Sequence, residues 1–504
     1  MHNKIQDLKS CLEKIAYVGS AVSMLHWDQQ VNMPKGAVDF RSNQLAYLES
    51  WAHKMQTGEE LKSLLSRVVD LESGEVVEKE LSEEEKIFAF ESWRDWRASN
   101  SLPDEFVEEF SRAQAKSFMA WQEAKQTEQF SLFENHLENM VSYAKKKANF
   151  LNPNIPTYDA LIDTFEPYMT TAKLDLLFGE LKSEVMKILE KIKKADIAFI
   201  DLNVSAWAKS SQERFIESVL NDLGYDLECG RQDFSEHPFS IAFHPTDARI
   251  TTYIKENDIK AGILASIHEC GHALYEQGLN PKWFATPLSE AVSFGVHESQ
   301  SRFYETRLGL SKPFWDWYFP ILKSHFNKQL KGITSYDFYK SMNQVIPGPI
   351  RLEAEELTYN LHIIIRYEIE KQMMNDDLTG QQISEIWNNK YEEYLGVKPR
   401  TYAEGVLQDV HWSEGYIGYF PSYVLGCIYA SQLYEKMLED MPDMEEKISR
   451  GEFIEIRNWL KVNIQEKGRL KKPADLIKDV TGREITIKPY VDYLNKKFGQ
   501  IYGF

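Results

Sequence analysis

The segment HECGH, residues 268–272, holds three side chains whose types and spacing suit metal chemistry. On an α-helix, positions four residues apart lie on one face about one turn from each other, so His268 and His272 can direct two ring nitrogens at one ion. Glu269 lies one residue further round the helix, where its carboxylate can act on a water beside the metal without being a ligand. Apolar residues recur at helical spacing around the segment, up to a stop signal at Gly278. The segment therefore predicts a helical metal site, although the same residue types also occur at these offsets by chance.

A catalytic zinc site needs a third protein ligand and an open position for water. Downstream, the stretch SEAVSFGVHESQSRFYE has helical spacing over residues 289–305 and offers three candidates, Glu298, His297 and Glu290. A neighbouring helix would bring any of them back to the histidine pair. The spacing alone does not choose among the three.

Length and composition indicate a large packed core. The chain has 504 residues, of which 43% are hydrophobic and 27% charged. Single cores usually stop growing well short of this length, so we expect two lobes, with any active site in the cleft between them.

The net charge and the cysteine pattern limit the macromolecules that the protein can bind and the residues that can hold a metal. The net charge of -19 opposes binding to nucleic acid and to an anionic membrane surface, and we find no apolar run long enough to span a bilayer. The four cysteines lie far apart without a CxxC pair, which argues against a thiolate zinc site. We therefore expect a cytoplasmic protein whose metal depends on other ligands.

Helical periodicity dominates the pattern along the chain. It predicts a first helix that ends near the MPKG turn at residues 33–36, and further helical stretches over 44–69, 71–110 and 176–195. The segment 239–254 is instead rich in β-branched and aromatic residues around a Pro-Thr-Asp turn, which predicts a short hairpin. No linker or repeat appears, so we expect one continuous, mostly helical domain.

Beyond these residues, the chain resembles the M32 family of metallocarboxypeptidases, the carboxypeptidase Taq family, over nearly its whole length. The motifs that carry the resemblance are HPF at 237–239, DARIT at 247–251, HECGH at 268–272, HESQ at 297–300, IRLEAE at 350–355 and GVLQDVHW at 405–412. Together these motifs are far more specific than HExxH alone.

The resemblance implies a mainly α, two-lobed fold with a deep central groove and a small β-sheet lining it, similar to angiotensin-converting enzyme and neurolysin. It implies one catalytic domain over residues 1–504, in which N-terminal helices at about 1–130 cover the groove and a zinc-binding core occupies about 235–430. It also implies a homodimer with one zinc ion per subunit, for which cobalt or manganese can substitute.

The resemblance further implies that Glu298, the acid of HESQ, is the third metal ligand beside His268 and His272. His297 would then support the site. A metal in this position would activate water, and Glu269 would take the proton of that water and deliver it to the leaving amine.

An oxyanion forms in such a reaction and calls for a fixed hydrogen-bond donor. The segment HWSEGYIGYFPSYVLG offers His411 and Tyr423, and it is similar to the His-and-Tyr segment of related helical peptidases. Tyr416 and Tyr419 remain rivals, because buried tyrosines often only pack.

Recognition of a substrate's C-terminal carboxylate suits a guanidinium, and the resemblance points to Arg351. The alternative for Arg351 is an ion pair with one of the acids Glu353, Glu355 and Glu356. The family pattern has Ala-Asp where this sequence has Ala354 and Glu355, so a hydrogen bond from that position is in doubt.

Two further residues are candidates for contact with substrate. Arg249 suits either a structural role or the substrate backbone. His237, before a proline at the start of the hairpin, suits either a subsite or a structural role.

We therefore expect a zinc carboxypeptidase that releases single C-terminal residues from peptides with broad specificity. A close alternative is a zinc oligopeptidase that cuts short peptides internally, without a carboxylate clamp. A helical binding protein that has lost catalysis is the alternative from another class, and the intact HECGH counts against it.

Overall fold

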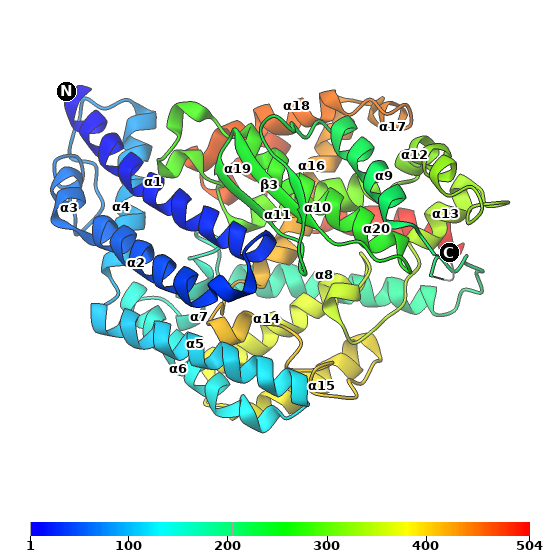
Figure 1. The fold of residues 1–504 in the computed structure, drawn as a ribbon, viewed down its shortest axis with the longest axis horizontal. Helices are drawn as coiled ribbons and strands as arrows, with labels where there is room; N and C mark the ends of the chain where they lie inside the picture. The colour runs from blue at the N-terminus through cyan, green and yellow to red at the C-terminus, as the bar shows by residue number, and fades with distance from the viewer. Residues whose placement is uncertain (1, 204–205) are drawn as a thin grey trace.

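The structure is a computed structural model that describes residues 2–203 and 206–504. These residues fold into many α-helices and a three-stranded sheet (Figure 1). The prediction of a mainly α fold with a small sheet is confirmed. Among the described residues, no helix combines the length and the apolar character that crossing a membrane requires.

The first third of the chain is helical. It contains α1 (His2–Val31), α2 (Val38–Thr57), α3 (Glu59–Leu65), α4 (Glu83–Asn100) and α5 (Asp104–Thr127). As predicted, the first helix ends just before the MPKG turn. In Figure 1, α1 and α2 run side by side across the left half of the molecule. Apolar residues of α1, α3 and α4, such as Leu8, Leu61 and Phe88, form a small core of their own that also includes Trp283 and Leu288.

The prediction of helix from residue 71 is wrong at its start. Residues 66–82 form turns, with an isolated bridge between Val69 and Val76. Gly74 has a φ of +77°, and a Cβ there would lie 2.4 Å from the ring of Trp93. A left-handed glycine packed under a tryptophan ends helical geometry, and α4 begins only at Glu83.

The predicted hairpin is confirmed and carries one more strand. The strands are β1 (Gln232–Phe234), β2 (Ser240–His244) and β3 (Asp247–Thr252). β2 and β3 pair antiparallel around the Pro-Thr turn, and β1 adds to the other edge of β3 in parallel, with Gln232 and Ser240 both opposite Ile250. β3 packs against the helix that carries HECGH, and β2 contacts α1.

Three helices build the centre of the molecule: α10 (Ile259–Gly278), α11 (Phe294–Arg302) and α16 (Pro421–Asp440). α10 holds HECGH and begins at the cap residue Asp258, whose carboxylate accepts hydrogen bonds from the backbone N–H groups of Lys260 and Ala261. α11 holds HESQ and continues into a π-helical turn, Phe303–Gly309. α11 packs against both α10 and α16.

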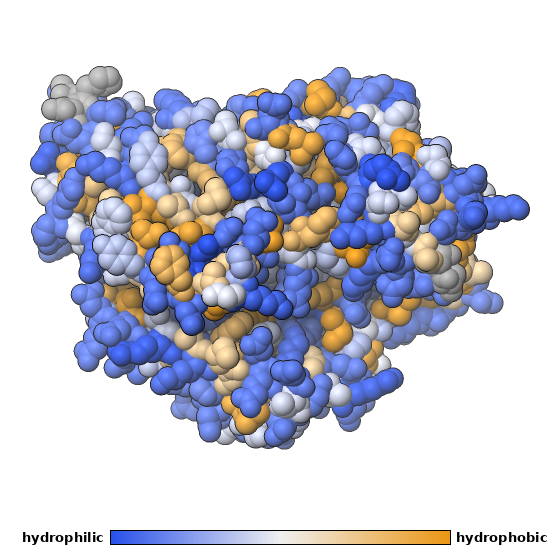
Figure 2. Space-filling model, in the orientation of Figure 1, coloured by the Kyte–Doolittle hydropathy of each residue, from blue (hydrophilic) through white to orange (hydrophobic). Residues whose placement is uncertain are grey.

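The other helices surround this centre, with α8 crossing the middle of Figure 1 and α5, α6 and α15 along its lower edge. Their bounds are α6 (Glu134–Leu151), α7 (Thr157–Ile162), α8 (Thr171–Ile192), α9 (Lys209–Asp222), α12 (Lys312–His325), α13 (Ser335–Met342), α14 (Tyr359–Asn375), α15 (Gly380–Leu395), α17 (Met444–Ile448), α18 (Ile454–Asn463), α19 (Pro473–Thr481) and α20 (Lys488–Tyr502). In Figure 2 the surface is mostly hydrophilic and is hollowed below the α1–α2 pair.

The contact between α11 and α16 depends on a glycine. A Cβ on Gly426 of α16 would lie 2.5 Å from Cγ of Glu298 on α11. We therefore expect Gly426→Ala to force the two helices apart, to lower the free energy of unfolding by about 1–3 kcal/mol and to reduce the divalent metal retained after dialysis. Urea unfolding and elemental analysis measure the two effects.

Gly179→Ala on α8 is the matched control, because a Cβ there meets nothing within 4 Å. Its expected effect is neutral or stabilising by up to about 1 kcal/mol. Equal unfolding midpoints for the Gly426→Ala and wild-type proteins would contradict the packing argument.

Candidate metal centre

Ring nitrogens of two histidines and a carboxylate oxygen converge between α10 and α11. Glu298 Oε2 lies 3.4 Å from His272 Nε2 and 3.7 Å from His268 Nε2. The three potential ligand atoms all lie within 4.8 Å of one another. Glu298 is 5% exposed, whereas both imidazoles keep a partly open face. The structure thus brings together the three residues predicted as metal ligands.

His268 is oriented by a second carboxylate. Its Nδ1 lies 2.8 Å from Glu305 Oε2, in the π-helical turn. Because an ionised carboxylate only accepts hydrogen bonds, Nδ1 carries a proton, and Nε2 is the ring nitrogen that faces Glu298 and His272. This orientation leaves Nε2 as the atom that a metal would use.

Arg302 holds both acids in place. Its Nε donates to Glu298 Oε1 at 2.9 Å and its Nη1 donates to Glu305 Oε2 at 3.1 Å. The guanidinium carbon lies 3.8 Å from the centre of the Tyr359 ring. Ser301 Oγ also donates to Glu298 Oε2, at 2.9 Å. Each carboxylate therefore has a fixed orientation.

His272 is held by stacking. Its ring lies 4.4 Å from the ring of His297 at an interplanar angle of 18°. His297 Nε2 in turn donates to Glu276 Oε1 at 3.0 Å. Nδ1 of His272 is buried and has no hydrogen-bond partner among the described residues. Packing, and not a hydrogen bond, thus sets the direction of this ring.

The geometry separates the three candidates for the third ligand. Glu290 forms an ion pair with Arg469, and His297 is turned toward Glu276. Within the described residues, Glu298 is the candidate whose oxygen joins the two histidines.

The donor set fits a divalent metal. Two imidazole nitrogens and one carboxylate oxygen are ligands that zinc accepts. Arg302 pairs with both Glu298 and Glu305, so these three side chains carry one excess negative charge, two minus one. A bound cation would balance that excess.

Glu269 lies next to the ligands on α10 and is 8% exposed. Burial is the main cause that raises the pKa of its carboxyl, to about 7. Its neighbour Cys270 is fully buried and packs in the core, as expected for a thiol on the opposite side of the helix.

His411 and Tyr423 meet beside this centre. The ring of His411 comes from the short turn His411–Glu414, and its Nε2 lies 3.4 Å from the hydroxyl of Tyr423 on α16. Burial, with help from two nearby guanidinium groups, lowers the pKa of His411 to about 3, so the ring is neutral at neutral pH. Burial also raises the pKa of Tyr423 well above its usual value, which keeps the hydroxyl a donor.

The two rival tyrosines differ in their placement. The Tyr419 ring lies 5.2 Å from the Tyr423 ring and 5.5 Å from the His411 ring. Tyr416 is 47% exposed. Of the four residues, Tyr416 is the one turned to solvent.

Arg351 forms an ion pair, but not with the acids that the sequence suggested. Its Nε and Nη2 both lie 2.9 Å from Asp409 Oδ1, within GVLQDVHW, whereas Asp409 Oδ2 lies 2.6 Å from Nε of Arg366. All three side chains are at least nine-tenths buried. Burial alone would raise the pKa of Asp409, but the two guanidinium groups outweigh it and hold that pKa well below its usual range.

One carboxylate thus serves two guanidinium groups, and the cluster keeps one positive charge in excess, two minus one. The Arg351 guanidinium carbon lies 5.5 Å from the Tyr423 ring. An unneutralised positive charge therefore lies beside the predicted oxyanion donor.

The acids near Arg351 have other partners. Glu355 accepts hydrogen bonds from the backbone N–H groups of Leu357 and Thr358 at the start of α14. The Glu355 carboxylate, one methylene longer than the aspartate of the family pattern, therefore caps a helix. Glu356 is buried between Arg307 and Lys497.

Arg249 and His237 lie at the sheet. Arg249 makes a two-pronged pair with Asp247, at 2.7 and 2.9 Å, and its guanidinium lies 5.7 Å from the Trp27 ring of α1. Trp27 also packs against Phe239 of HPF. His237 is exposed.

Comparison with known proteins agrees with this geometry. Residues 7–498 match the family model of the carboxypeptidase Taq (M32) metallopeptidases. Carboxypeptidase 1 of Bacillus subtilis is 38% identical, over 100% of this chain and 99% of the relative. Thermostable carboxypeptidase 1 of Thermus thermophilus is 36% identical, over 99% of both chains. The crystal structure of the M32 carboxypeptidase from Deinococcus radiodurans superimposes with a TM-score of 0.96 at 33% identity, over 99% of this chain and 100% of that one.

The chain belongs to the M32 family. Its enzyme class is therefore that of the metallocarboxypeptidases, which are peptide hydrolases.

Several supporting residues of this M32 site were missed from the sequence. Glu305 follows Glu298 by seven residues, which is the same helix face, so its place could have been predicted. Asp409 stands inside a motif that was noted, two residues before His411. Arg302 follows Glu298 by four residues on the same helix, so its ion pair could also have been predicted. Tyr359 comes from α14, and no local pattern indicates that α14 meets α11.

The pairing at Asp409 predicts a stability effect. Asp409→Asn leaves two buried guanidinium groups without a counter-charge, so we expect the free energy of unfolding at pH 7 to fall by about 3–5 kcal/mol. Because the folded pKa of Asp409 is depressed, its contribution is complete above the unfolded pKa of about 3.9 and is lost as pH falls below it. The difference between wild type and variant should therefore be constant from pH 7 to 5 and shrink below about pH 4.

Urea unfolding at a series of pH values measures this difference. Asp479→Asn removes an exposed pair with Lys471 and serves as the control, with an expected change below about 0.5 kcal/mol. A difference that grows toward acid pH would show that Asp409 is not the stabilising anion.

Proposed function

We propose that this M32 protein is a zinc-dependent carboxypeptidase that releases single C-terminal residues from peptides with broad side-chain specificity. The observation that carries the proposal is the pairing of two charge excesses: a negative one at His268, His272 and Glu298, and a positive one at Arg351 beside Tyr423.

His268, His272 and Glu298 would hold the metal through Nε2, Nε2 and the Oε2 side of the carboxylate. When bound, a zinc ion supplies a Lewis acid that polarises the scissile carbonyl and lowers the pKa of the attacking water. Cobalt or manganese would satisfy the same ligands.

Glu269 would accept the proton of the attacking water and return it to the nitrogen of the leaving residue. Its place on α10, one residue after His268, supports this role, because its carboxylate borders the ligands without joining them. The buried position excludes bulk water as a competing proton acceptor.

His411 and Tyr423 would stabilise the oxyanion. The Tyr423 hydroxyl keeps its proton at neutral pH and can donate it as a hydrogen bond, and His411 lies against that hydroxyl. Tyr419 would position Tyr423 through ring contact.

Arg351 would bind the terminal carboxylate of the peptide. Asp409 occupies Nε and Nη2 of Arg351, which leaves Nη1 available as a donor. Because Arg366 shares the Asp409 carboxylate with Arg351, the cluster has one positive charge more than it has negative charges. A substrate carboxylate would neutralise that charge. Arg249 and His237 would contact the substrate from the sheet.

Experiments can distinguish two alternative functions from the carboxypeptidase. An oligopeptidase would use the same metal centre and cut internal bonds without needing the positive cluster. A non-catalytic binding protein would retain the fold without hydrolysis.

We also infer the setting of the activity from the family resemblance and the charge. Residues 1–504 would form one catalytic domain, with helices up to about residue 130 covering the groove and a zinc-binding core at about 235–430. The protein would act as a cytoplasmic homodimer on peptides with a free C-terminus, without nucleic acid or membrane partners.

Hydrolysis of matched peptides tests the proposal. We expect a free-acid peptide to yield a ladder of products that lose single C-terminal residues in mass spectra, and its C-terminal amide to be cleaved at least about 100-fold more slowly, since a buried charge pair contributes several kcal/mol. A chelator should abolish the ladder, and Glu269→Gln should lower kcat by about 10²- to 10⁴-fold.

The exposed Glu228→Gln is the matched control and should behave as wild type. Internal cleavage of both peptides would favour the oligopeptidase. Absence of cleavage after reconstitution with zinc or cobalt would favour the binding protein.

Arg351 has its own test. Arg351→Gln removes the charge that a terminal carboxylate would meet, so the ratio of kcat/KM for free acid over amide should fall by about 100-fold, mostly through KM. Arg351→Lys should recover part of that ratio. A ratio unchanged in Arg351→Gln would assign the carboxylate to another residue.

A further inference from the structure

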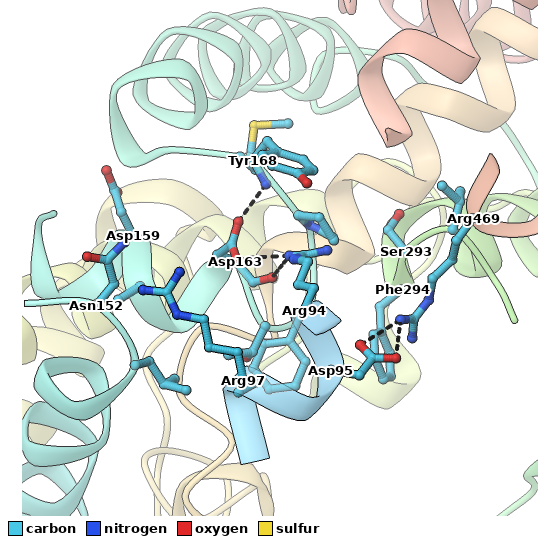
Figure 3. Close-up of a pocket in the computed structure, with 18 of the residues that line it drawn as sticks. Arg94, Asp95, Arg97, Asn152, Asp159, Asp163, Tyr168, Ser293, Phe294 and Arg469 are labelled. Carbon is cyan, nitrogen blue, oxygen red and sulfur yellow. Dashed lines mark hydrogen bonds and ion pairs between the residues drawn. The ribbon is translucent and has the colours of Figure 1, made fainter. Parts of the chain in front are cut away.

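A cavity of about 940 Å³ opens beside the metal centre (Figure 3). Its walls come from α4, from the segment 151–170 around α7, and from the segment 290–297 that leads into α11. Its volume is at the upper end of the range for ligand pockets. None of the residues given a catalytic or metal role above lines it, so the proposed chemistry leaves this space unexplained.

The cavity continues the site along α10. Glu276, which lines it, follows His272 by four residues and so lies on the same face of the helix, about 6 Å further along. His297, another lining residue, stacks on His272. Phe294 in the wall lies 5.4 Å from the ring of Tyr419, the neighbour of Tyr423.

Arg351 lies toward the other end of the centre. The Arg351 guanidinium lies near the Tyr423 ring, and that ring contacts the ring of Tyr359. Tyr359 in turn packs on Arg302, which donates a hydrogen bond to Glu305. A peptide whose C-terminus meets Arg351 and whose scissile bond lies at the metal can continue past His272 into the cavity. The cavity is where its upstream residues would go.

Most charges in the cavity wall already have partners. Asp163 pairs with Arg94, and both Asp95 and Glu290 pair with Arg469. Figure 3 shows the first two of these pairs as dashed contacts. The two remaining acids are also engaged, Glu276 by His297 and Asp159 by the backbone N–H of Thr171.

Arg97 is different. Its side chain is exposed and makes no ion pair or hydrogen bond to another side chain among the described residues. Its guanidinium lies 5.2 Å from the ring of Trp93. In Figure 3 it reaches toward Asn152, away from the pair of Asp95 and Arg469. It is thus a cation available to a ligand.

We propose that this cavity binds the part of the substrate N-terminal to the scissile bond and that Arg97 selects an acidic side chain there. The inference rests on the proposed function, because the direction of the peptide follows from the carboxylate at Arg351. An extended peptide advances about 3.3 Å per residue. The residue about two positions N-terminal to the one at His272 would therefore lie at Glu276, and residues further toward the N-terminus would reach Arg97.

A series of otherwise neutral peptides, each with a single glutamate at a different position, tests the inference. The peptides share their C-terminal residues, and glutamate or glutamine stands at the third, fourth, fifth or sixth position upstream of the scissile bond. Equilibrium binding of fluorescent peptides is measured on zinc-loaded Glu269→Gln protein, where turnover does not interfere, and kcat/KM is measured on protein with Glu269 intact.

At one position, we expect glutamate to be favoured over glutamine by about 2- to 5-fold in both binding and kcat/KM. Arg97→Gln should reduce this ratio to about 1 through Kd and KM, and Arg97→Lys should retain part of it. Arg112→Gln, which removes an exposed α5 arginine outside the cavity, should leave the ratio unchanged.

Equal binding of the glutamate and glutamine peptides at every position would overturn the inference, as would a preference that persists in Arg97→Gln. Binding that depends on Arg97 without hydrolysis of any peptide would support the cavity assignment and defeat the proposed function. The two failures are therefore distinguishable.

Discussion

The close approach of α10, α11 and α16 is the constraint on which the rest of the structure depends. Two glycines make it possible. A Cβ on Gly271, inside HECGH, would lie 2.6 Å from the backbone of Ser301 on α11, and a Cβ on Gly426 would collide with Glu298 from the other side. α11 is thus held closely between two helices, against the α10 backbone on one side and through the Glu298 side chain on the other. This contact fixes the distance between the histidine pair and Glu298, because α11 cannot move along or away from α10 without a clash.

Charge imbalance follows from that packing. With the helices this close, water screens the buried acid Glu298 poorly, and Arg302 is the guanidinium that pairs with it. Arg302 also donates a hydrogen bond to Glu305, the acid that orients His268, so one side chain fixes both carboxylates. The remaining negative charge favours a cation in the site. The same helices that give the ligands their geometry therefore also create the electrostatic demand for a metal.

Local patterns in the sequence predicted the parts of this arrangement that depend on one helix. The i,i+4 spacing was sufficient to place His268 and His272 on one helix face with Glu269 beside them, and β-branched and aromatic residues around a turn were sufficient for the β2–β3 hairpin. Glu298 could be selected only by resemblance, because its meeting with the histidines is a contact between helices. The same limit explains why β1, a parallel partner of β3, was missed. It also explains why the alternative ion-pair partners considered for Arg351 were nearby acids, whereas its partner is Asp409, 58 residues away. At residues 66–82, one left-handed glycine overrode a plausible helical pattern.

The two charge clusters also explain why exopeptidase chemistry suits this fold better than internal cleavage. Arg351, Arg366 and Asp409 keep their positive excess in a buried position, where water compensates it poorly. The backbone of an internal peptide segment offers only neutral amides to that position, whereas a terminal carboxylate offers a full negative charge and two acceptor oxygens. In the proposed function, a chain end would gain free energy by neutralising the cluster beside Tyr423, where the scissile carbonyl would be held. Recognition of the end of the chain and alignment of the bond to be broken would then be the same interaction.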